Sequence, residues 1–313
     1  MPMSSKKLTP FLTILDVGHG NAAVLHDEGG TVVFDTGKGA SVGIHLSNMG
    51  IRQVRALFLS HADVDHIGGA VTLLLNRSVM IDEVLLNSDA TKESDTFKQL
   101  RYALAEANAR DGTRIERRLA NSTKIKRKGT KIEVLHPPDA IVLTGVGGIL
   151  PSGKRLTSNS MSAAIRVLRN SKSSILLGGD IEYDCVDEWK RAKVRPLASA
   201  LVFPHHGGLP GTSDESEAKL FGYEITKLVC PDVIVFSNHR TRFGNPRDCI
   251  LKAITKAVTG VRFVCTQLPQ QFHLDVKAKG CWSLHKSGED IVDGSICLVF
   301  QRSGLKLSFG EKP

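Results

Sequence analysis

Residues 60–69 read Ser-His-Ala-Asp-Val-Asp-His-Ile-Gly-Gly and follow directly on the apolar run 54–59, Val-Arg-Ala-Leu-Phe-Leu. The run is typical of a buried strand, and the chain after it places two imidazoles and two carboxylates at positions 61, 63, 65 and 66. Imidazole with carboxylate suits zinc, manganese or iron better than calcium, which prefers all-oxygen shells. The spacing lets the four side chains serve two adjacent ions. A solvated Asp/His turn is the alternative, and the complete pattern followed by glycines 68 and 69 disfavours it.

Other acidic and imidazole residues also stand at the ends of apolar, strand-like segments and precede glycine or a turn. They are Asp16 after 11–15, Asp35 after 31–34, Asp180 after 174–179, and His205 and His206 after 200–204. Side chains at strand ends converge on one edge of a sheet, where the scaffold fixes them and loops leave room for a substrate. We therefore expect these residues to meet the 61–66 cluster in one site. Glycines 68 and 69 are expected to permit close approach of the backbone to metal or phosphate.

These motifs together resemble the metallo-β-lactamase fold superfamily, in the branch typified by the soluble nuclease-like domain of the DNA-uptake competence protein ComEC. The segments that carry the resemblance are 16–22, 35–37, 61–69, 179–180 and 205–207, in this order along residues 11 to about 250. The resemblance implies an α/β fold, namely an αββα sandwich of two mixed β-sheets flanked by helices. It also implies a metal-dependent hydrolase with two divalent ions, zinc or manganese. The motifs are specific to the superfamily and far less specific to a substrate.

Carried over position by position, the resemblance implies a dinuclear metal site. The implied ligands are His61, Asp63, Asp65, His66, Asp180, His205 and His206. The first two would bind one ion, the next two the other, and Asp180 would bridge both. The tandem histidines would supply one imidazole per ion, because neighbouring side chains rarely reach one ion but can reach two. Which histidine serves which ion is left open.

Further positions are implied to support the ligands or face the substrate. They are Asp16, His19, Asp35, Asn159, Ser162 and Asn245. The carboxylates at 16 and 35 are expected to orient imidazole ligands through the second ring nitrogen. The chain departs from the branch at His19 and Asn21, where glutamine and aspartate are usual, and at Asn245-Pro246, which replaces a His-Pro. His239 is expected to supply the lost imidazole near the scissile group, a surface-turn histidine being the alternative. The predicted catalytic residues are thus Asp65, Asp180 and His239.

The chain of 313 residues is basic, with 41 Lys and Arg against 32 Asp and Glu, a net charge of +9 and a pI near 9.3. This balance favours an anionic partner, with nucleic acid the leading candidate. The predicted nucleic-acid contacts lie in one basic segment and are Arg114, Arg117, Arg118, Lys124, Lys126, Arg127 and Lys128. A solvated charged face is the alternative. No aromatic residue interrupts the segment, so base stacking is not indicated.

The leading hypothesis is a cytoplasmic, metal-dependent phosphodiesterase that acts on nucleic acid, with DNA favoured. A second hypothesis keeps the site and changes the substrate to a small phosphodiester, a cyclic nucleotide, or a lactone or β-lactam ring. A third is a metal-bearing subunit that binds a protein partner in a multi-component assembly and has no turnover. The sequence shows no signal peptide and no apolar stretch near the ~20 residues of a membrane span, so no membrane partner is expected.

We predict a single domain over residues 1–313, with pseudo-twofold halves at roughly 1–140 and 155–313. Residues 137–158, rich in proline and glycine, are predicted to be a flexible insertion that covers the active site as a lid. The helical periodicity of residues 92–109 predicts a core-facing helix. The basic segment is predicted to form a β-hairpin or an edge strand.

Overall fold

The computed structural model describes residues 9–125, 127–270, 285–287, 290–292 and 294–309. A nine-stranded mixed sheet and a six-stranded mixed sheet form its centre, and β14 (His285–Ser287) pairs with β15 (Asp290–Val292) in a separate hairpin. The larger sheet runs in the order β17 (Leu305–Phe309), β16 (Ile296–Phe300), β1 (Phe11–Ile14), β2 (Ala22–Asp27), β3 (Gly30–Thr36), β4 (Gln53–Phe58), β6 (Glu83–Leu85) and β7 (Arg114–Glu116), with β5 (Met80–Ile81) also paired to β4. The smaller sheet runs in the order β13 (Arg262–Cys265), β12 (Val233–Phe236), β11 (Ala200–Val202), β10 (Ser173–Leu177), β9 (Ala164–Asn170) and β8 (Lys131–His136).

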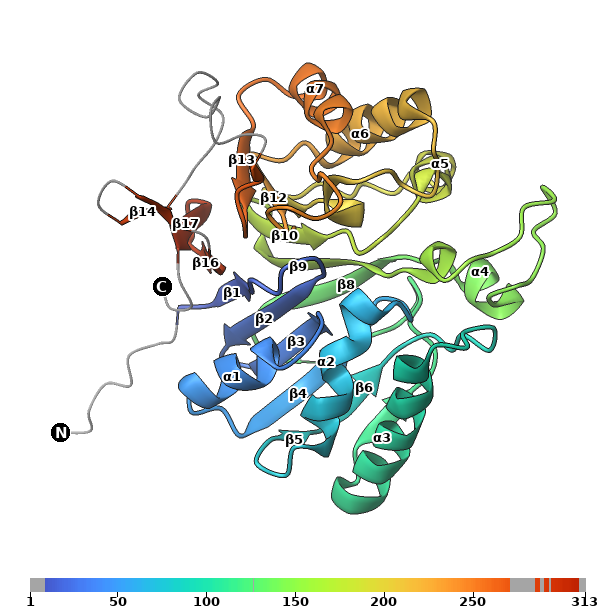
Figure 1. Ribbon diagram of the computed structural model, residues 1–313, viewed down its shortest axis with the longest axis vertical. Coiled ribbons are helices and arrows are strands. Elements are labelled where there is room, and N and C mark those ends of the chain that lie inside the picture. Colours follow the sequence, from blue (N-terminus) through green and yellow to red (C-terminus); the bar gives the residue numbers. More distant parts are fainter. Residues whose placement is uncertain (1–8, 126, 271–284, 288–289, 293, 310–313) are drawn as a thin grey trace.

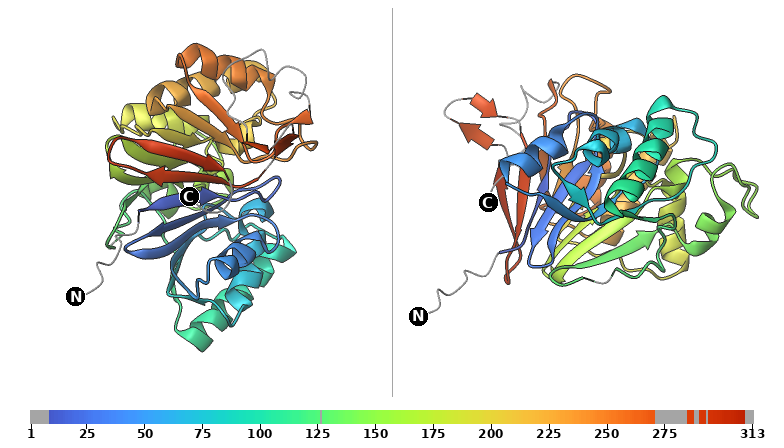
Figure 2. Two further views of the ribbon diagram at one scale, coloured as in Figure 1. Left: turned by 90° about the vertical axis from the view of Figure 1, so that its left-hand side faces the viewer. Right: turned by 90° about the horizontal axis from the view of Figure 1, so that it is seen from below.

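Helices cover the outer face of each sheet, as Figures 1 and 2 show. The larger sheet is covered by α1 (Ser41–Asn48), α2 (Val64–Leu75) and α3 (Asp95–Asp111). The smaller sheet is covered by α5 (Tyr183–Arg191), α6 (Glu215–Val229) and α7 (Asp248–Ala257). The predicted αββα sandwich of two mixed sheets is therefore confirmed.

Both faces of the central strands are buried, because one faces the opposite sheet and the other faces helices. Along β2, Ala23 and Leu25 belong to the core between the sheets, whereas Ala22 and Val24 belong to the core under the helices. Strands of this kind read as continuous apolar runs, since successive side chains point to opposite faces. This explains why the runs that end at the predicted site residues are mostly apolar, with Arg55 in β4 as an exposed exception.

The start of α3 differs from the prediction. The helix begins at Asp95 rather than at residue 92, because the side chain of Ser94 caps it by accepting a hydrogen bond from the N–H of Phe97 (3.3 Å). Gly112, at φ 69°, ends it in the left-handed conformation typical of a helix C-terminus. Lys92 is consequently a loop residue.

The two sheets do not divide the chain at one point. Strand β8 belongs to the smaller sheet although it precedes residue 140, and β16 and β17 return to the larger sheet beside β1. Residues 137–158 contain the short helix α4 (Asp139–Thr144) and an isolated bridge between Ile149 and Arg155. The basic segment supplies β7, which is the edge strand of the larger sheet. No helix in the described part of the chain has the length and apolar character needed to cross a membrane.

Candidate metal centre

The loop after β4 carries the 61–66 cluster and turns directly into α2, whose N-cap is Asp63. A Cβ added to Gly69 would stand 2.4 Å from the carbonyl oxygen of Gly39 and 2.9 Å from that of Thr36. The glycine therefore lets α2 pack closely against the chain that leaves β3. The prediction that glycines 68 and 69 approach a metal or phosphate is therefore wrong. They pack against the backbone of residues 36–39 instead.

Asp180 follows β10 and lies at the centre of the cluster, 7% exposed. Its Oδ2 atom is 3.8 Å from Nε2 of His61 and 3.7 Å from Nδ1 of His205. Its Oδ1 atom is 3.3 Å from Nε2 of His66 and 3.8 Å from Nε2 of His206. Each oxygen of one carboxylate thus faces a different pair of imidazoles, which is the arrangement that a ligand bridging two ions requires.

The two carboxylates of the 61–66 cluster join these pairs. Oδ2 of Asp63 lies 3.8 Å from Nε2 of His61, and Oδ2 of Asp65 lies 3.4 Å from Nε2 of His206. We define donor set A as His61, Asp63 and His205 with Oδ2 of Asp180, and donor set B as Asp65, His66 and His206 with Oδ1 of Asp180. The tandem histidines, which the sequence left unassigned, are therefore divided between the two sets.

The tandem histidines owe this division to an uncommon backbone conformation. His205 and His206 lie in the short 3₁₀ segment Pro204–Gly207 with φ of 52° and 55°, in the left-handed region. Residues with a Cβ pay about 1–2 kcal/mol for each such conformation. Backbone strain of this kind persists mostly where function requires it. Here it allows adjacent rings to face different oxygens of Asp180.

Several buried atoms of the cluster have no hydrogen-bond partner among the residues that the structure describes. They are Nε2 of His61, His66 and His206, and Oδ1 of Asp180. All four residues are less than a tenth exposed, and a buried polar atom without a partner costs about 1–3 kcal/mol. Cations coordinated by these atoms would satisfy them, and mixed imidazole and carboxylate donors suit zinc, manganese or iron. The residues present thus fit divalent metal ions.

Burial and neighbouring charges together set the protonation of the histidines in the cluster. Burial is the main reason why the pKa of His61 is lowered to about 4, and the neighbouring His66 lowers it further. Burial alone would also lower the pKa of His66, but Asp180 and Asp35 outweigh it and hold that pKa well above its ordinary value. His61 is thus already in the neutral form that binds metal, whereas a cation has to displace a proton from His66.

Supporting contacts orient the imidazoles from their second ring nitrogen. Nδ1 of His66 lies 2.8 Å from Oδ2 of Asp35, which also accepts a hydrogen bond from the hydroxyl of Ser60 (2.8 Å). Nδ1 of His206 lies 2.8 Å from the carbonyl oxygen of Ser237. Such contacts select the ring tautomer that leaves Nε2 free to bind metal. Asp35 therefore stands where the sequence predicted an orienting carboxylate.

Ser162 supports the cluster from the segment before β9. Its hydroxyl oxygen accepts a hydrogen bond from the backbone N–H of Asp180 (2.8 Å) and lies 3.3 Å from Nδ1 of His61. Asn159, the first residue of the 3₁₀ helix Asn159–Met161, accepts a bond from the N–H of Ser162 through its backbone carbonyl (3.0 Å). The backbone of Asn159 thus acts on the cluster through the position of Ser162.

Asp16 does not contact a ligand imidazole in the way the sequence predicted. Its Oδ1 atom accepts hydrogen bonds from the N–H of Gly18 and the side-chain amide of Gln267, both at 3.0 Å. Asp16 therefore shapes the loop that follows β1, and the expected orienting role is corrected to this one.

His239 is engaged in its own turn. Its Nδ1 atom accepts hydrogen bonds from the N–H groups of Thr241 (3.2 Å) and Arg242 (3.3 Å).

Asn245 supports the tandem histidines through the backbone, since its side-chain amide donates to the carbonyl of His205 (3.4 Å). The structure thus brings Asn245 to the cluster and holds the Nδ1 side of His239 in a turn.

Two contacts of the cluster were missed by sequence reasoning. Lys92 forms an ion pair through Nζ with Oδ1 of Asp63, and no local pattern points from one to the other. The hydroxyl of Ser60 lies 3.0 Å from Nδ1 of His61 and 3.2 Å from Nδ1 of His66. Ser60 directly precedes the 61–66 cluster in the sequence, and this position could have predicted its contacts with the two histidines.

Three arginines of the basic segment form ion pairs with carboxylates. Arg127 lies 2.6 Å from Asp27, and the two side chains are 9% and 0% exposed. The prediction that Arg127 contacts nucleic acid is therefore corrected, because a carboxylate already occupies its guanidinium. In the same segment, Arg114 pairs with Glu83 (2.7 Å). Arg118 pairs with Asp139 (2.5 Å). Arg117, Lys124 and Lys128 are exposed, and Lys126 lies outside the described residues.

Known proteins share parts of this sequence. Residues 15–157 match the family model of the metallo-beta-lactamase superfamily. Over 251 residues the chain is 25% identical to ComE operon protein 3 of Bacillus subtilis, a match that covers 76% of this chain and 28% of that protein. The chain thus spans only about a quarter to a third of this curated relative. The match agrees with the predicted competence-protein branch.

Solved structures share the architecture at low identity. The metallo-beta-lactamase fold protein YhfI from Bacillus subtilis is 13% identical, with a TM-score of 0.48 over 82% of this chain and 95% of that chain. Human tRNase Z, short form, is 14% identical, with a TM-score of 0.40 over 71% and 91%. Scores this low carry no argument about activity. The family match and the observed αββα sandwich together show that the chain has the metallo-β-lactamase fold and resembles that superfamily of metal-dependent hydrolases.

Proposed function

We propose that the chain is a dinuclear metal-dependent phosphodiesterase that acts on nucleic acid, with DNA favoured. The observation that carries the proposal is the pair of donor sets A and B, which meet at the two oxygens of Asp180. Their buried, unpartnered atoms are arranged for ligands that carry positive charge.

Each donor set would hold one divalent ion. Cations held there would supply Lewis acidity, which activates water for in-line attack and neutralises charge on a phosphoryl oxygen. The carboxylate of Asp63 in set A is a harder ligand than imidazole, which moves the preference toward manganese, with zinc as the second choice.

The chain's own residues prepare this site for catalysis. Asp35 and the carbonyl of Ser237 hold the rings of His66 and His206 in fixed orientations. Ser162 positions the backbone of Asp180 by accepting its N–H. Preorganised ligands of this kind avoid the cost of reorganisation during the reaction. Asp180 faces both donor sets and Asp65 contributes to set B, and we assign the catalytic role to these two carboxylates.

An anionic polymer is the substrate class that the charge balance favours. The net charge of +9 includes acidic residues that bound cations would neutralise, so the remaining surface is more basic still. Arg117, Lys124 and Lys128 are exposed, and unlike the exposed Arg114 and Arg118 they form no ion pair within the described part of the chain, so they remain our candidates for phosphate contacts.

A small phosphodiester is the second candidate substrate, and the pairing of Arg114, Arg118 and Arg127 with carboxylates favours it. Guanidinium groups that are already paired contribute little to tracking a phosphate backbone. Under this alternative the donor sets and the chemistry are unchanged.

The test supplies the purified chain with Mn²⁺ or Zn²⁺ and offers plasmid, a single-stranded oligonucleotide and bis-p-nitrophenyl phosphate. We expect the parent protein to cleave the polymers and Asp180→Asn to lose this activity. The control Asp82→Asn is to retain it, because Asp82 pairs with Arg55 outside the cluster. Turnover of the chromogenic diester alone would favour the small-substrate alternative. Two bound ions without any turnover would show a metal-bearing binding subunit and overturn the proposal.

A further inference from the structure

His19 is a third imidazole beside donor set B. It lies in the loop between β1 and β2, and its side chain is 16% exposed. The sequence reasoning placed it among supporting positions. In the structure, the His19 ring lies closer to the ligand atoms of donor set B than a supporting residue needs to be.

Two hydrogen bonds hold the loop that carries His19, one to the 61–66 cluster and one to the segment after β12. The N–H of Asn21 donates to the carbonyl of Asp65 (3.1 Å), and the hydroxyl of Ser237 donates to the carbonyl of Gly20 (2.6 Å). A Cβ on Gly20, at φ 149°, would stand 2.4 Å from the carbonyl oxygen of Asp65. Glycine is therefore required for this close approach, which fixes the backbone next to His19.

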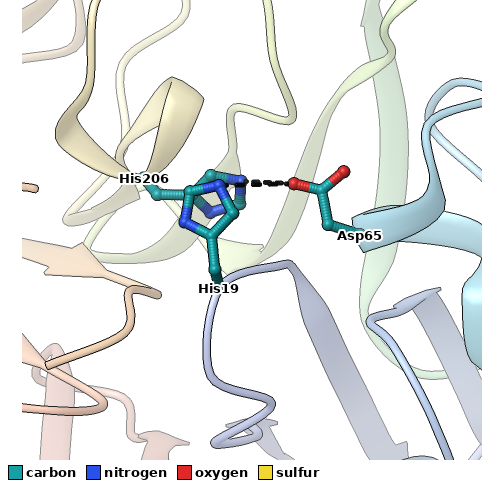
Figure 3. Close-up of side chains that lie close together, drawn as sticks. All are labelled: His19, Asp65 and His206. Carbon is teal, nitrogen blue, oxygen red and sulfur yellow. Dashed lines mark ion pairs between the residues drawn. The ribbon is translucent and has the colours of Figure 1, made fainter. Parts of the chain in front are cut away.

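The ring of His19 is also fixed. It packs against two rings, with centroid distances of 4.2 Å to His206 and 4.1 Å to Phe243. Figure 3 shows the rings of His19 and His206 together, facing the carboxylate of Asp65. An imidazole already packed against two neighbouring rings loses less freedom when it binds a ligand than an unconstrained one.

The distances among these donors match those of ligands on a common ion. Nε2 of His19 lies 3.5 Å from Oδ2 of Asp65, and Nε2 of His206 lies 3.4 Å from the same oxygen. One ligand atom from each of the three residues lies within 4.8 Å of the others. Two donors about 2.1 Å from one ion stand roughly 3.0–3.5 Å apart at octahedral to tetrahedral angles. A charge-assisted hydrogen bond would be shorter, about 2.7–2.9 Å.

We propose that Nε2 of His19 is an additional ligand of the cation held by donor set B. The inference rests on the proposed metal site and adds a residue to it. Set B then has three imidazoles and two carboxylate oxygens, whereas set A has two imidazoles and two carboxylate oxygens. Five protein ligands exceed the four of a tetrahedral zinc site, and they select a divalent cation that accepts five or six ligands, such as manganese.

The test measures metal binding directly on the full chain, first freed of metal with a chelator. Equilibrium dialysis against Mn²⁺ is to give two ions per chain in the parent protein. In His19→Ala we expect the affinity for one ion to fall by about 100-fold, since loss of an outer-shell partner alone costs 10–100-fold. The affinity for the other ion is to stay unchanged, as are both affinities in the control Asp82→Asn, since Asp82 pairs with Arg55 outside the cluster.

A second readout counts ligands without reference to activity. The visible absorption of the Co²⁺-loaded chain intensifies when the coordination number of an ion falls, and we expect this change in His19→Ala but not in Asp82→Asn. Unchanged affinities and spectra in His19→Ala would overturn the inference and leave the proposed function standing. A parent protein that binds neither Mn²⁺ nor Co²⁺ would overturn both. Circular dichroism confirms that each variant is folded.

Discussion

The metal centre and the basic segment of residues 114–128 both gather charged side chains, but the two regions treat them in opposite ways. In the metal centre, ligand atoms of His61, His66 and Asp180 are buried and have no hydrogen-bond partner in the described part of the chain. In the basic segment, the guanidinium groups of Arg114 and Arg127 each have a carboxylate partner within 2.7 Å. The first arrangement is incomplete without a ligand, whereas the second is already satisfied.

The comparison separates functional from structural clusters on physical grounds. Unsatisfied buried polar atoms cost free energy and persist where a ligand compensates them. A closed ion pair needs no further partner, and its contribution depends on burial. Charge density along the sequence does not distinguish the two cases.

The largest effect is expected from removing the central carboxylate. In Asp180→Ala we expect turnover of bis-p-nitrophenyl phosphate to fall by about 1,000-fold or more, because both donor sets lose an oxygen ligand. The metal content, measured by elemental analysis, is to fall below two ions per chain, while circular dichroism stays that of the parent. Full activity in this variant would mean that the metal centre is not the active site.

Breaking the buried ion pair tests the other side of the comparison. Arg127→Met leaves Asp27, whose side chain is 0% exposed, without its guanidinium partner. We expect the free energy of unfolding in urea to fall by about 3–5 kcal/mol, with the metal content unchanged. Arg114→Gln is the matched control, because its pair with Glu83 is exposed and contributes little. Equal stability losses in both variants would remove the distinction between the two pairs.

A buried histidine contact outside the metal centre sharpens the comparison through pH. Nε2 of His26 lies 3.2 Å from that of His45, with Thr31, Asp27 and the ring of Phe11 also beside His26. Burial, followed by His45, lowers the pKa of His26 to about 4.

The folded chain therefore keeps His26 neutral where the unfolded chain takes up a proton. Its stabilising contribution is complete above pH 6.5 and is lost as the pH falls toward 4, by about 3 kcal/mol. Urea unfolding of the metal-free chain at several pH values is to show this slope. His26→Gln is to show a shallower one, and identical slopes would contradict the assignment.

The smallest effect concerns the exposed remainder of the basic segment. If Arg117 contacts phosphate, Arg117→Gln is to reduce the slope of log affinity against log salt by about 1. Arg114→Gln is to leave that slope unchanged because Glu83 occupies its guanidinium. Binding to an oligonucleotide at several salt concentrations measures both. Equal slopes in the parent and both variants would exclude Arg117 as a phosphate contact.

Much of the fold could be predicted from the sequence because its signals are local. Apolar runs ending in Asp16, Asp35 and Asp180 correspond to β1, β3 and β10, since buried strands require continuous apolar residues. The cluster at 61–66 stands directly after β4, and the family resemblance of its motif implied the division between Asp63 and Asp65. The start of α3 was misjudged because the periodicity continued past the cap at Ser94.

The tertiary structure alone decided which donors meet. The division of His205 and His206 depends on two left-handed residues whose rings face different oxygens of Asp180, and side-chain order along the chain carries no such information. Arg127 finds its partner 100 residues away at Asp27, across the packing of the chain. Local sequence determines burial and periodicity, whereas pairing between distant residues is determined by how the two sheets pack together.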